Sequence, residues 1–308
     1  MKLPSPYFLL LAAASAFMSI SSQAETRCPG NVTGLRARIV AGALLVIPVK
    51  VNQSGPFDFV VDTGGQLNVI DPALAAHLNL KSRGTVGLVA VAAYSHASVG
   101  VLDSLQAGSQ LVLSPIVVTQ DLGQVQAVDP RIRGVLGENF LAHFDVLLDY
   151  SRKLLCLDEA KLMEKYLRGE RIPLVTSKHP ETEVPFSQRL VVSVNLSDTG
   201  SRPILLQVDS GSDRPILYAG NRELEQLLLK RAKLQGPAVS DARRAAFAAL
   251  PLQDMRLGSR IVRNVPFVTP ASGSKDIPDR EEAGILATVL FQRVYVSHSD
   301  RVVIFDPR

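Results

Sequence analysis

Aromatic residues are scarce in this sequence. None of the 308 residues is tryptophan, and aromatic residues together make up only 6% of the chain. Sugar-binding platforms and grooves for single-stranded nucleic acids are built largely from aromatic side chains that stack on the ligand. The composition therefore argues against both kinds of site.

A large excess of either charge is also absent. The chain has 33 lysine and arginine residues against 29 aspartate and glutamate residues, and the basic residues are scattered, at most in short pairs such as Arg243-Arg244. Nucleic-acid-binding proteins collect basic residues on one surface. We therefore expect no nucleic-acid partner.

Cysteine is limited to Cys28 and Cys156. Their spacing matches no CxxC or zinc-binding motif, and the five histidines form no HExxH motif, so the sequence predicts no metal site and no cofactor. In an oxidising compartment the two cysteines would be able to pair. We expect a disulfide between Cys28 and Cys156; the alternative is two separate buried thiols.

Only one hydrophobic run resembles a targeting segment, and it lies at the N-terminus. Lys2 precedes an apolar run over residues 7–20, which is followed by the small-x-small sequence Ser22-Gln23-Ala24. This pattern predicts a signal peptide over residues 1–24. The alternative is an uncleaved anchor, but a bilayer span needs about 20 apolar residues and this run is shorter. We expect a secreted or periplasmic protein without stable membrane insertion.

The chain is about twice as long as a typical domain, and it contains an internal repeat. Residues 47–65 and 190–212 each contain an apolar strand, a polar turn and a second apolar strand that ends at an aspartate. The order of features continues downstream, where Gly-Val-Leu-Gly at 134–137 is paralleled by Gly-Ile-Leu-Ala at 284–287. The repeat predicts two homologous halves.

The predicted boundary between the halves lies in the polar stretch 168–183. It gives an N-terminal lobe over residues 25–170 and a C-terminal lobe over residues 171–308. Strand patterns dominate both lobes, so the expected fold class is all-β with a few short helices. The expected helices cover Pro72–Leu78, Glu159–Leu167 and Asn221–Lys233.

Asp62 and Asp209 end equivalent strands of the repeat, and each begins an Asp-Thr/Ser-Gly tripeptide. One such tripeptide is often an ordinary turn. Two copies after buried strands are more informative, because an unpaired carboxylate is costly to bury. A two-fold relation between the halves would bring the two carboxyl groups together, where they would share one proton. Such a pair is able to hydrolyse an amide through an activated water.

These motifs resemble those of the pepsin/retropepsin-type aspartic proteases, and most closely those of single-chain, bilobal bacterial retropepsin-like proteins. The family hallmark is an apolar residue before Asp-Thr/Ser-Gly and, later in each lobe, two apolar residues followed by Gly. The first lobe has Val61–Gly64 with Val135–Gly137, and the second has Val208–Gly211 with Ile285–Ala287. The resemblance covers about residues 43 to 306.

The resemblance implies two β-barrel lobes related by pseudo-two-fold symmetry, with a polypeptide substrate bound between them. It implies an aspartic endopeptidase, active as a monomer, with Asp62 and Asp209 as the catalytic dyad; the alternative is that two chains pair instead of two lobes. Supporting roles in the active-site loops are implied for a further set of residues: Thr63, Gly64, Ser210, Gly211 and Ser212, the last through a hydrogen bond to Asp209.

Two residues depart from the family's motifs, and the role of a third residue is open. Gly65 stands where pepsins have Ser or Thr, and Ala287 replaces the glycine of the second lobe. The segment 84–100 is the candidate flap hairpin of the first lobe, with Tyr94 either a flap aromatic or an ordinary hairpin residue. Because of Gly65 and Ala287, the alternative function is a catalytically impaired peptide-binding or assembly protein on the same fold.

Overall fold

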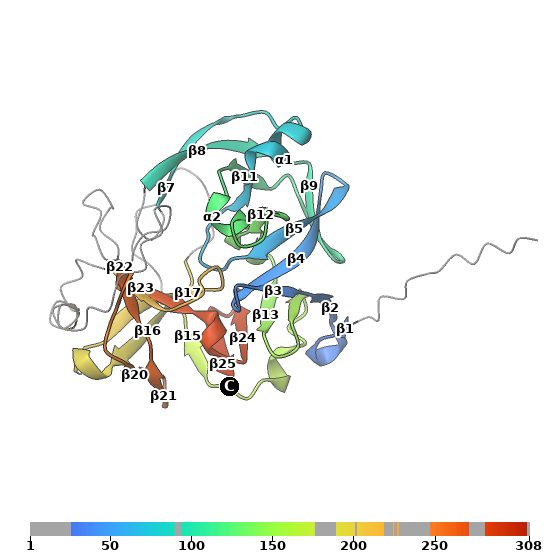
Figure 1. The fold of residues 1–308 in the computed structure, drawn as a ribbon. Helices are drawn as coiled ribbons and strands as arrows, with labels where there is room; N and C mark the ends of the chain where they lie inside the picture. The colour runs from blue at the N-terminus through green and yellow to red at the C-terminus, as the bar shows by residue number, and fades with distance from the viewer. Residues whose placement is uncertain are drawn as a thin grey trace, which may run out of the picture.

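The computed structural model describes residues 26–89, 94–175, 189–200, 202–218, 224, 227, 247–270 and 281–306. Strands dominate this part of the chain, and its three α-helices are short (Figure 1). The expected all-β, two-lobed fold is confirmed. The predicted signal peptide lies outside the described residues. So does most of the helix predicted over 221–233, of which only Leu224 and Leu227 are described, both buried.

The first lobe is built on a ten-stranded sheet. Nine of its strands follow the order β10-β9-β4-β5-β12-β6-β11-β8-β7, and the tenth, β3, pairs with β4. Its helices α1 (Pro72–His77), α2 (Gly123–Gln126) and α3 (Glu138–Leu141) lie in connections. The strands are β3 (Arg38–Val40), β4 (Leu44–Val51), β5 (Ser54–Val61), β6 (Asn68–Ile70), β7 (Gly84–Val89), β8 (Tyr94–Val101), β9 (Ser104–Ala107), β10 (Gln110–Leu113), β11 (Ile116–Thr119) and β12 (Ile132–Leu136).

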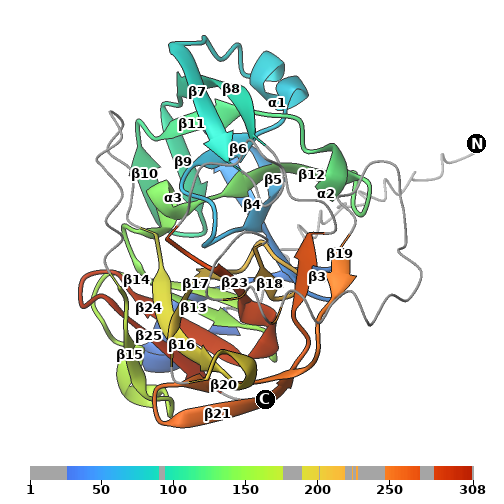
Figure 2. The ribbon, with the colours of Figure 1, turned by 90° about the vertical axis from the view of Figure 1, so that its left-hand side faces the viewer.

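The second lobe repeats this plan in an eight-stranded sheet with the order β19-β22-β18-β23-β17-β16-β20-β21. Figure 2 shows the two sheets one above the other, with the strands that carry the repeat facing the middle of the molecule. The strands are β16 (Val191–Leu196), β17 (Ile204–Asp209), β18 (Ile216–Leu217), β19 (Phe247–Ala249), β20 (Gln253–Leu257), β21 (Arg260–Val265), β22 (Val268–Pro270) and β23 (Gly284–Ala287).

The repeat is visible in the strand register. In the first lobe β12 pairs parallel to β5, with Leu136 opposite Val61, and antiparallel to β6. In the second lobe β23 pairs parallel to β17, with Leu286 opposite Val208, and antiparallel to β18. β17 and β23 are buried along nearly their whole length, which suits their central positions in the sheet. Each lobe therefore places the strand that ends at its aspartate beside the strand of its apolar-apolar-Gly/Ala motif.

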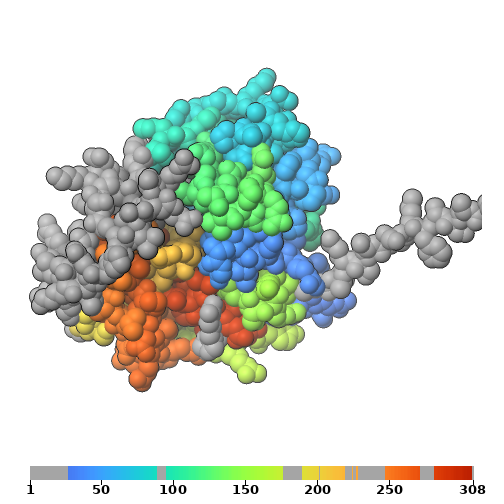
Figure 3. Space-filling view, in the orientation of Figure 1, coloured from blue at the N-terminus to red at the C-terminus, as the bar shows by residue number. Residues whose placement is uncertain are grey.

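A third sheet contains strands from both halves, in the order β1-β2-β14-β13-β24-β25-β15. Figure 3 shows the first half of the chain mostly above the second half, with early and late segments mixed in the lower part where this sheet lies. The predicted boundary falls just before β15. The strands are β1 (Thr26–Arg27), β2 (Thr33–Arg36), β13 (Asp145–Asp149), β14 (Leu154–Asp158), β15 (Arg171–Pro173), β24 (Arg293–Ser297) and β25 (Val302–Asp306).

The structure pairs Cys28 with Cys156 in a disulfide, as expected, and so attaches the segment before β2 to β14. The helix predicted over Glu159–Leu167 is wrong, because only the 3-10 helix Glu164–Tyr166 forms there. The reason is the Asp158 carboxylate, which accepts hydrogen bonds from the backbone amides of Ala160, Leu162 and Met163. An aspartate that binds the amides following it in this way stabilises a turn in competition with an α-helix.

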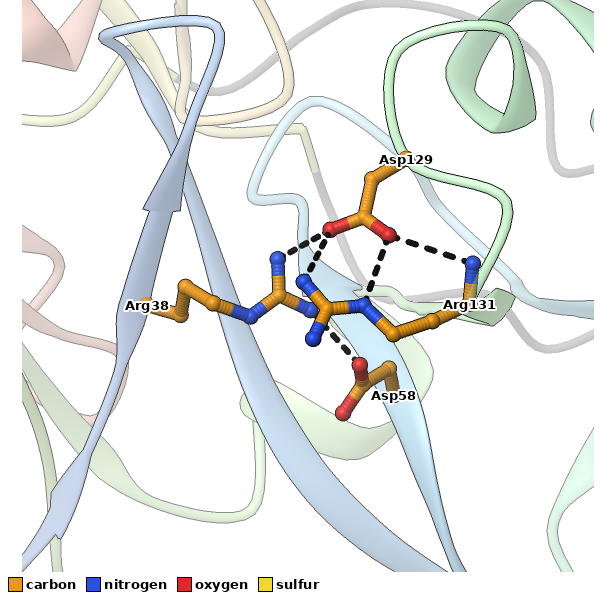
Figure 4. A network of polar contacts seen from close by, with 4 residues as sticks. All are labelled: Arg38, Asp58, Asp129 and Arg131. Atoms are coloured by element: carbon orange, nitrogen blue, oxygen red, sulfur yellow. Dashed lines mark hydrogen bonds and ion pairs between the residues drawn. The ribbon is translucent and has the colours of Figure 1, made fainter.

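An ion-pair network outside the site ties β3 to the connection that leads into β12 (Figure 4). Arg38 contacts Asp58 of β5 at 2.6 Å and also contacts Asp129. Asp129 is buried and accepts further hydrogen bonds of 3.0 Å from Arg131. Arg131, followed by Arg38, holds the pKa of Asp129 well below its usual range. The network therefore fixes the start of β12, which runs under the site.

Among the described residues, no helix is both long and apolar enough to cross a membrane.

Candidate functional site

Two loops that begin at the repeated aspartates meet in the middle of the molecule. We call residues 62–67 the first Asp loop and residues 209–214 the second Asp loop. Asp62 follows β5, and its backbone amide donates a hydrogen bond to the Leu136 carbonyl at 3.0 Å. Asp209 is the last residue of β17 and pairs with Ala287. The structure therefore brings Asp62 and Asp209 together, and a hydrogen bond joins their side chains.

Thr63 and Ser210 join the two loops through reciprocal hydrogen bonds. The Thr63 amide donates to Ser210 Oγ at 3.0 Å, and the Ser210 amide donates to Thr63 Oγ1 at 3.0 Å. Each hydroxyl then donates across the interface, Thr63 to the Val208 carbonyl at 3.1 Å and Ser210 to the Val61 carbonyl at 2.8 Å. Both side chains are fully buried, so water cannot replace these bonds. They hold the loops in a two-fold arrangement.

Gly64 and Gly211 allow each loop to approach the opposite carboxyl group. A Cβ atom on Gly64 would lie 2.4 Å from Cγ of Asp209, and one on Gly211 would lie 2.5 Å from Cγ of Asp62. No side chain fits at such distances, so the tight packing around the two carboxyl groups requires glycine at both positions.

Backbone amides hold the two carboxylates in place. Asp62 Oδ1 accepts from the amides of Gly64 at 2.8 Å and Gly65 at 3.0 Å. Asp209 Oδ1 accepts from the amide of Gly211 at 2.7 Å. Ser212 contributes its backbone amide to Asp209. Its hydroxyl, for which the sequence suggested that role, donates to the carbonyl of Arg214 at 2.8 Å instead.

The environment raises the pKa of both aspartates, but not equally. Burial raises the pKa of Asp209 well above its usual value, and the neighbouring charge of Asp62 raises it further. Burial also raises the pKa of Asp62, but hydrogen bonds from Gly64, from Asp209 and from Gly65 oppose this effect. Two close carboxyl groups cannot both ionise easily. The geometry therefore favours a proton on Asp209 that is donated to an ionised Asp62.

Gly65 and Ala287 both fit the observed geometry. A Cβ atom on Gly65 would lie 2.9 Å from Asp62 Oδ2, so the site is tight as it stands. Ala287 is fully buried beside Asp209, which nevertheless keeps its contacts with Asp62 and Gly211. Its counterpart in the first lobe, Gly137, has no room for the side chain of alanine, because a Cβ there would lie 2.3 Å from the Leu67 carbonyl oxygen.

Sequence reasoning missed Gln207. This buried residue of β17 reaches across the interface, and its Nε2 donates to the Gly64 carbonyl at 2.8 Å. The only sequence signal is a polar residue inside the apolar strand Ile204–Asp209, two residues before Asp209. Gln207 adds a contact between the lobes on one side only, since the equivalent residue of the first lobe is Val60.

The candidate flap forms a hairpin of β7 and β8, in which Tyr94 pairs with Val89. Residues 90–93 and the side chain of Tyr94 lie outside the described residues. Within the described ranges, the structure shows no cluster of three or more His, Cys, Asp or Glu side chains arranged to hold a metal ion.

The chain is similar to known aspartic proteases. The sequence model of the family described as aspartyl protease matches residues 47–140, which include the first Asp loop. A retropepsin-like aspartic protease from Rickettsia conorii is similar at 21% identity over 41% of this chain and 90% of that chain, with a TM-score of 0.30. No curated protein gave a significant match.

A second solved structure extends the similarity over both lobes. The aspartic proteinase from Irpex lacteus is similar over 89% of this chain and 97% of that chain, at 11% identity and with a TM-score of 0.51. At this identity the likeness shows the fold, while the sequence match to residues 47–140 shows the relationship. On these two grounds, residues 47–140 match the aspartyl protease family, and the fold of both lobes is that of the pepsin-like aspartic proteases.

Proposed function

We propose that the protein is an aspartic endopeptidase in which Asp62 and Asp209 activate a water molecule for attack on a peptide bond. The observation that carries this proposal is the meeting of two carboxyl groups, the buried one of Asp209 and the half-buried one of Asp62, which are joined by a hydrogen bond and held by unequal sets of backbone amides. Unequal environments of this kind separate the roles of base and acid within one pair.

The proposed reaction uses one proton of the pair and one water. Ionised Asp62 accepts a proton from the water, whose oxygen attacks the carbonyl carbon of the peptide bond. Protonated Asp209 donates its proton to the carbonyl oxygen, which becomes a hydroxyl of the tetrahedral intermediate. As the intermediate collapses, the proton on Asp62 passes to the leaving nitrogen, the C–N bond breaks, and Asp209 regains a proton from the hydroxyl. Atoms and charge balance without a cofactor.

The scaffold supports this chemistry by limiting movement of the two carboxyl groups. Thr63 and Ser210 lock the loops together, and the close approach of Gly64 and Gly211 leaves little room for rotation. Because a misplacement of about 1 Å can cost on the order of 10²-fold in rate, such rigidity is expected to matter. A polypeptide would bind between the lobes of a single chain, which acts as a monomer.

We also propose that the protein works outside the cytoplasm. The Cys28–Cys156 disulfide supports this proposal, because disulfides persist in oxidising compartments. The predicted signal peptide over residues 1–24 would direct the chain there. The measurement is the N-terminal residue and cellular fraction of the expressed full-length protein; a mature chain beginning at Glu25 in the exported fraction is expected, and an intact cytoplasmic chain would contradict the proposal.

The function is tested by digestion of casein, an unstructured polypeptide, from acidic to neutral pH. We expect the purified protein to cleave it and Asp209→Asn to be inactive, while Asp103→Asn, at an exposed aspartate of the first lobe, keeps full activity. Equal cleavage by the parent and Asp209→Asn would overturn the proposed dyad. A folded parent that binds casein without cleaving it would favour the peptide-binding alternative.

A further inference from the structure

A buried glutamate and a histidine form a pair beneath the first Asp loop. Glu138 begins α3 directly after Gly137, and only 1% of its surface is exposed. Its Oε2 lies 2.8 Å from Nε2 of His298, which follows β24 in the other half of the chain. The pair thus joins the sheet shared by both lobes to the support of the first Asp loop.

Two hydrogen bonds connect Glu138 to Asp62. The backbone amide of Glu138 donates to the Gly65 carbonyl at 2.8 Å, and the Gly65 amide donates to Asp62 Oδ1 at 3.0 Å. The two carboxyl groups also interact electrostatically, since a charge on Asp62 raises the pKa of Glu138. By reciprocity, a charge on Glu138 opposes the ionisation of Asp62.

The contacts of His298 determine how many protons the pair holds. Nδ1 lies 2.7 Å from the Phe144 carbonyl oxygen, which only accepts hydrogen bonds, so Nδ1 carries a hydrogen. Between Nε2 and Glu138 Oε2 there is then room for one proton, on either atom. In both cases the pair is neutral overall. Glu138 Oε1 is buried and has no hydrogen-bond partner among the residues that the structure describes, so this proton provides the compensation for the carboxylate charge.

The groups around the pair favour keeping that proton. Asp62 faces Glu138 from the first Asp loop, and Asp145 faces His298 from β13, where it accepts a hydrogen bond of 2.7 Å from Tyr295 of β24. Burial lowers the pKa of His298, but the contact with Glu138 outweighs it and the net pKa is raised; burial raises the pKa of Glu138.

We propose that Glu138 and His298 are positioning residues that share one proton, keep a neutral pair beneath the first Asp loop, and thereby set how readily Asp62 releases its own proton. This inference rests on the proposed function of Asp62 as the base. Neither residue touches the substrate or the water in this scheme; each acts through Asp62, and His298 acts through Glu138.

The test is the pH profile of kcat/KM for casein peptides in two opposite variants. His298→Gln leaves the Glu138 charge without its partner, so we expect the acidic limb of the profile to move to higher pH. Glu138→Gln replaces the carboxyl group that opposes the ionisation of Asp62 with a neutral amide, so the limb should move to lower pH. Each shift should be about half a pH unit to one pH unit, the size expected for one partly screened interior charge. His143→Gln, at an exposed histidine nearby, should leave the profile in place.

Shifts in the same direction, or none in either folded variant, would overturn the inference. If His298→Gln does not fold, Glu138→Gln decides alone, because a purely structural role would change stability without moving the limb. A titration of the His298 ring by NMR separates the two proposals. A pKa above the usual histidine value that falls in Glu138→Gln supports the pair even if the parent cleaves nothing, whereas an inactive parent would refute the proposed function alone.

Discussion

The two Asp loops are joined symmetrically but supported differently. The contacts between Thr63 and Ser210 are nearly the same in both directions. Outside them, the first Asp loop is held from below by the amide of Glu138 and packs closely on Gly137, whereas the second lies over Ala287 and carries the exposed ion pair of Asp213 and Arg214. The comparison indicates that symmetry brings the carboxyl groups together, and that the differing surroundings decide which one keeps the proton.

The largest expected effect separates activity from stability at the dyad. Both Asp62→Asn and Asp209→Asn should reduce kcat/KM by about 10²–10⁴-fold, because each removes one proton-transfer group. Since the pKa of Asp209 is raised in the folded protein, its contribution to stability is present below the unfolded-state pKa and is lost as the pH rises through the folded-state pKa. Asp209→Asn should therefore be more resistant to urea than the parent at neutral pH, although it has lost most of the activity.

The advantage of Asp209→Asn should disappear below about pH 4, the usual aspartate pKa. Urea unfolding at neutral and acidic pH measures it. A parent that is the more stable protein at neutral pH would show that Asp209 is ionised there and would contradict the assignment of the proton.

A second comparison concerns the two glycines that approach the opposite carboxyl groups. Gly64→Ala and Gly211→Ala should each lower kcat/KM by about 10²-fold or more, because the new methyl group displaces Asp209 or Asp62 respectively. The similar distances predict similar losses. A variant with parental activity would mean that the loops separate easily, which the kinetics of casein cleavage would show directly.

The reciprocal hydrogen bonds between the two loops should make similar contributions to the free energy of unfolding. Thr63→Val and Ser210→Ala each leave a buried backbone amide without a partner, so we expect a loss of about 1–3 kcal/mol in the free energy of unfolding for each. Denaturant titration measures both. The double variant should lose less than the sum, because the two side chains belong to one network; strict additivity would argue against that coupling.

The smallest effect is expected at Ala287. Ala287→Gly should change kcat/KM by less than about threefold and should destabilise the protein by about 1 kcal/mol, because glycine is more flexible in the unfolded chain. The converse change, Gly137→Ala, should be far more disruptive, since its methyl group would meet backbone oxygen. A large gain of activity in Ala287→Gly would show instead that the natural second loop is impaired.

The repeat allowed much of this architecture to be predicted from sequence. Apolar strands that end at Asp62 and Asp209, each followed later by an apolar-apolar-Gly/Ala motif, correctly indicated an all-β fold of two lobes built on the same plan, and the structure adds that the two strands of each motif pair lie side by side. Hydrogen bonds between side chains and the nearby backbone, which compete with the expected structure, were harder to predict. The Asp158 carboxylate binds the amides of a segment whose composition suited a helix, and Ser212 turns its hydroxyl toward Arg214.

The partners of contacts across the fold could not be predicted from the sequence. Gln207 finds its partner in Gly64 of the other lobe, and Glu138 finds His298 from the other half of the chain. A polar residue in an apolar strand, such as Gln207, indicates that a buried partner is needed, but only the packing of distant strands determines which partner satisfies it.

The shared sheet has a consequence for the order in which the protein forms during synthesis. β13 and β14 are made in the first half of the chain, but β13 pairs with β24, which is made after the whole second Asp loop. Pairing between strands so far apart in sequence is slow, because a long loop must close first. The nascent chain is therefore expected to lack a finished site until its second half has emerged, which would keep a proteolytic activity silent while the polypeptide is still being translated.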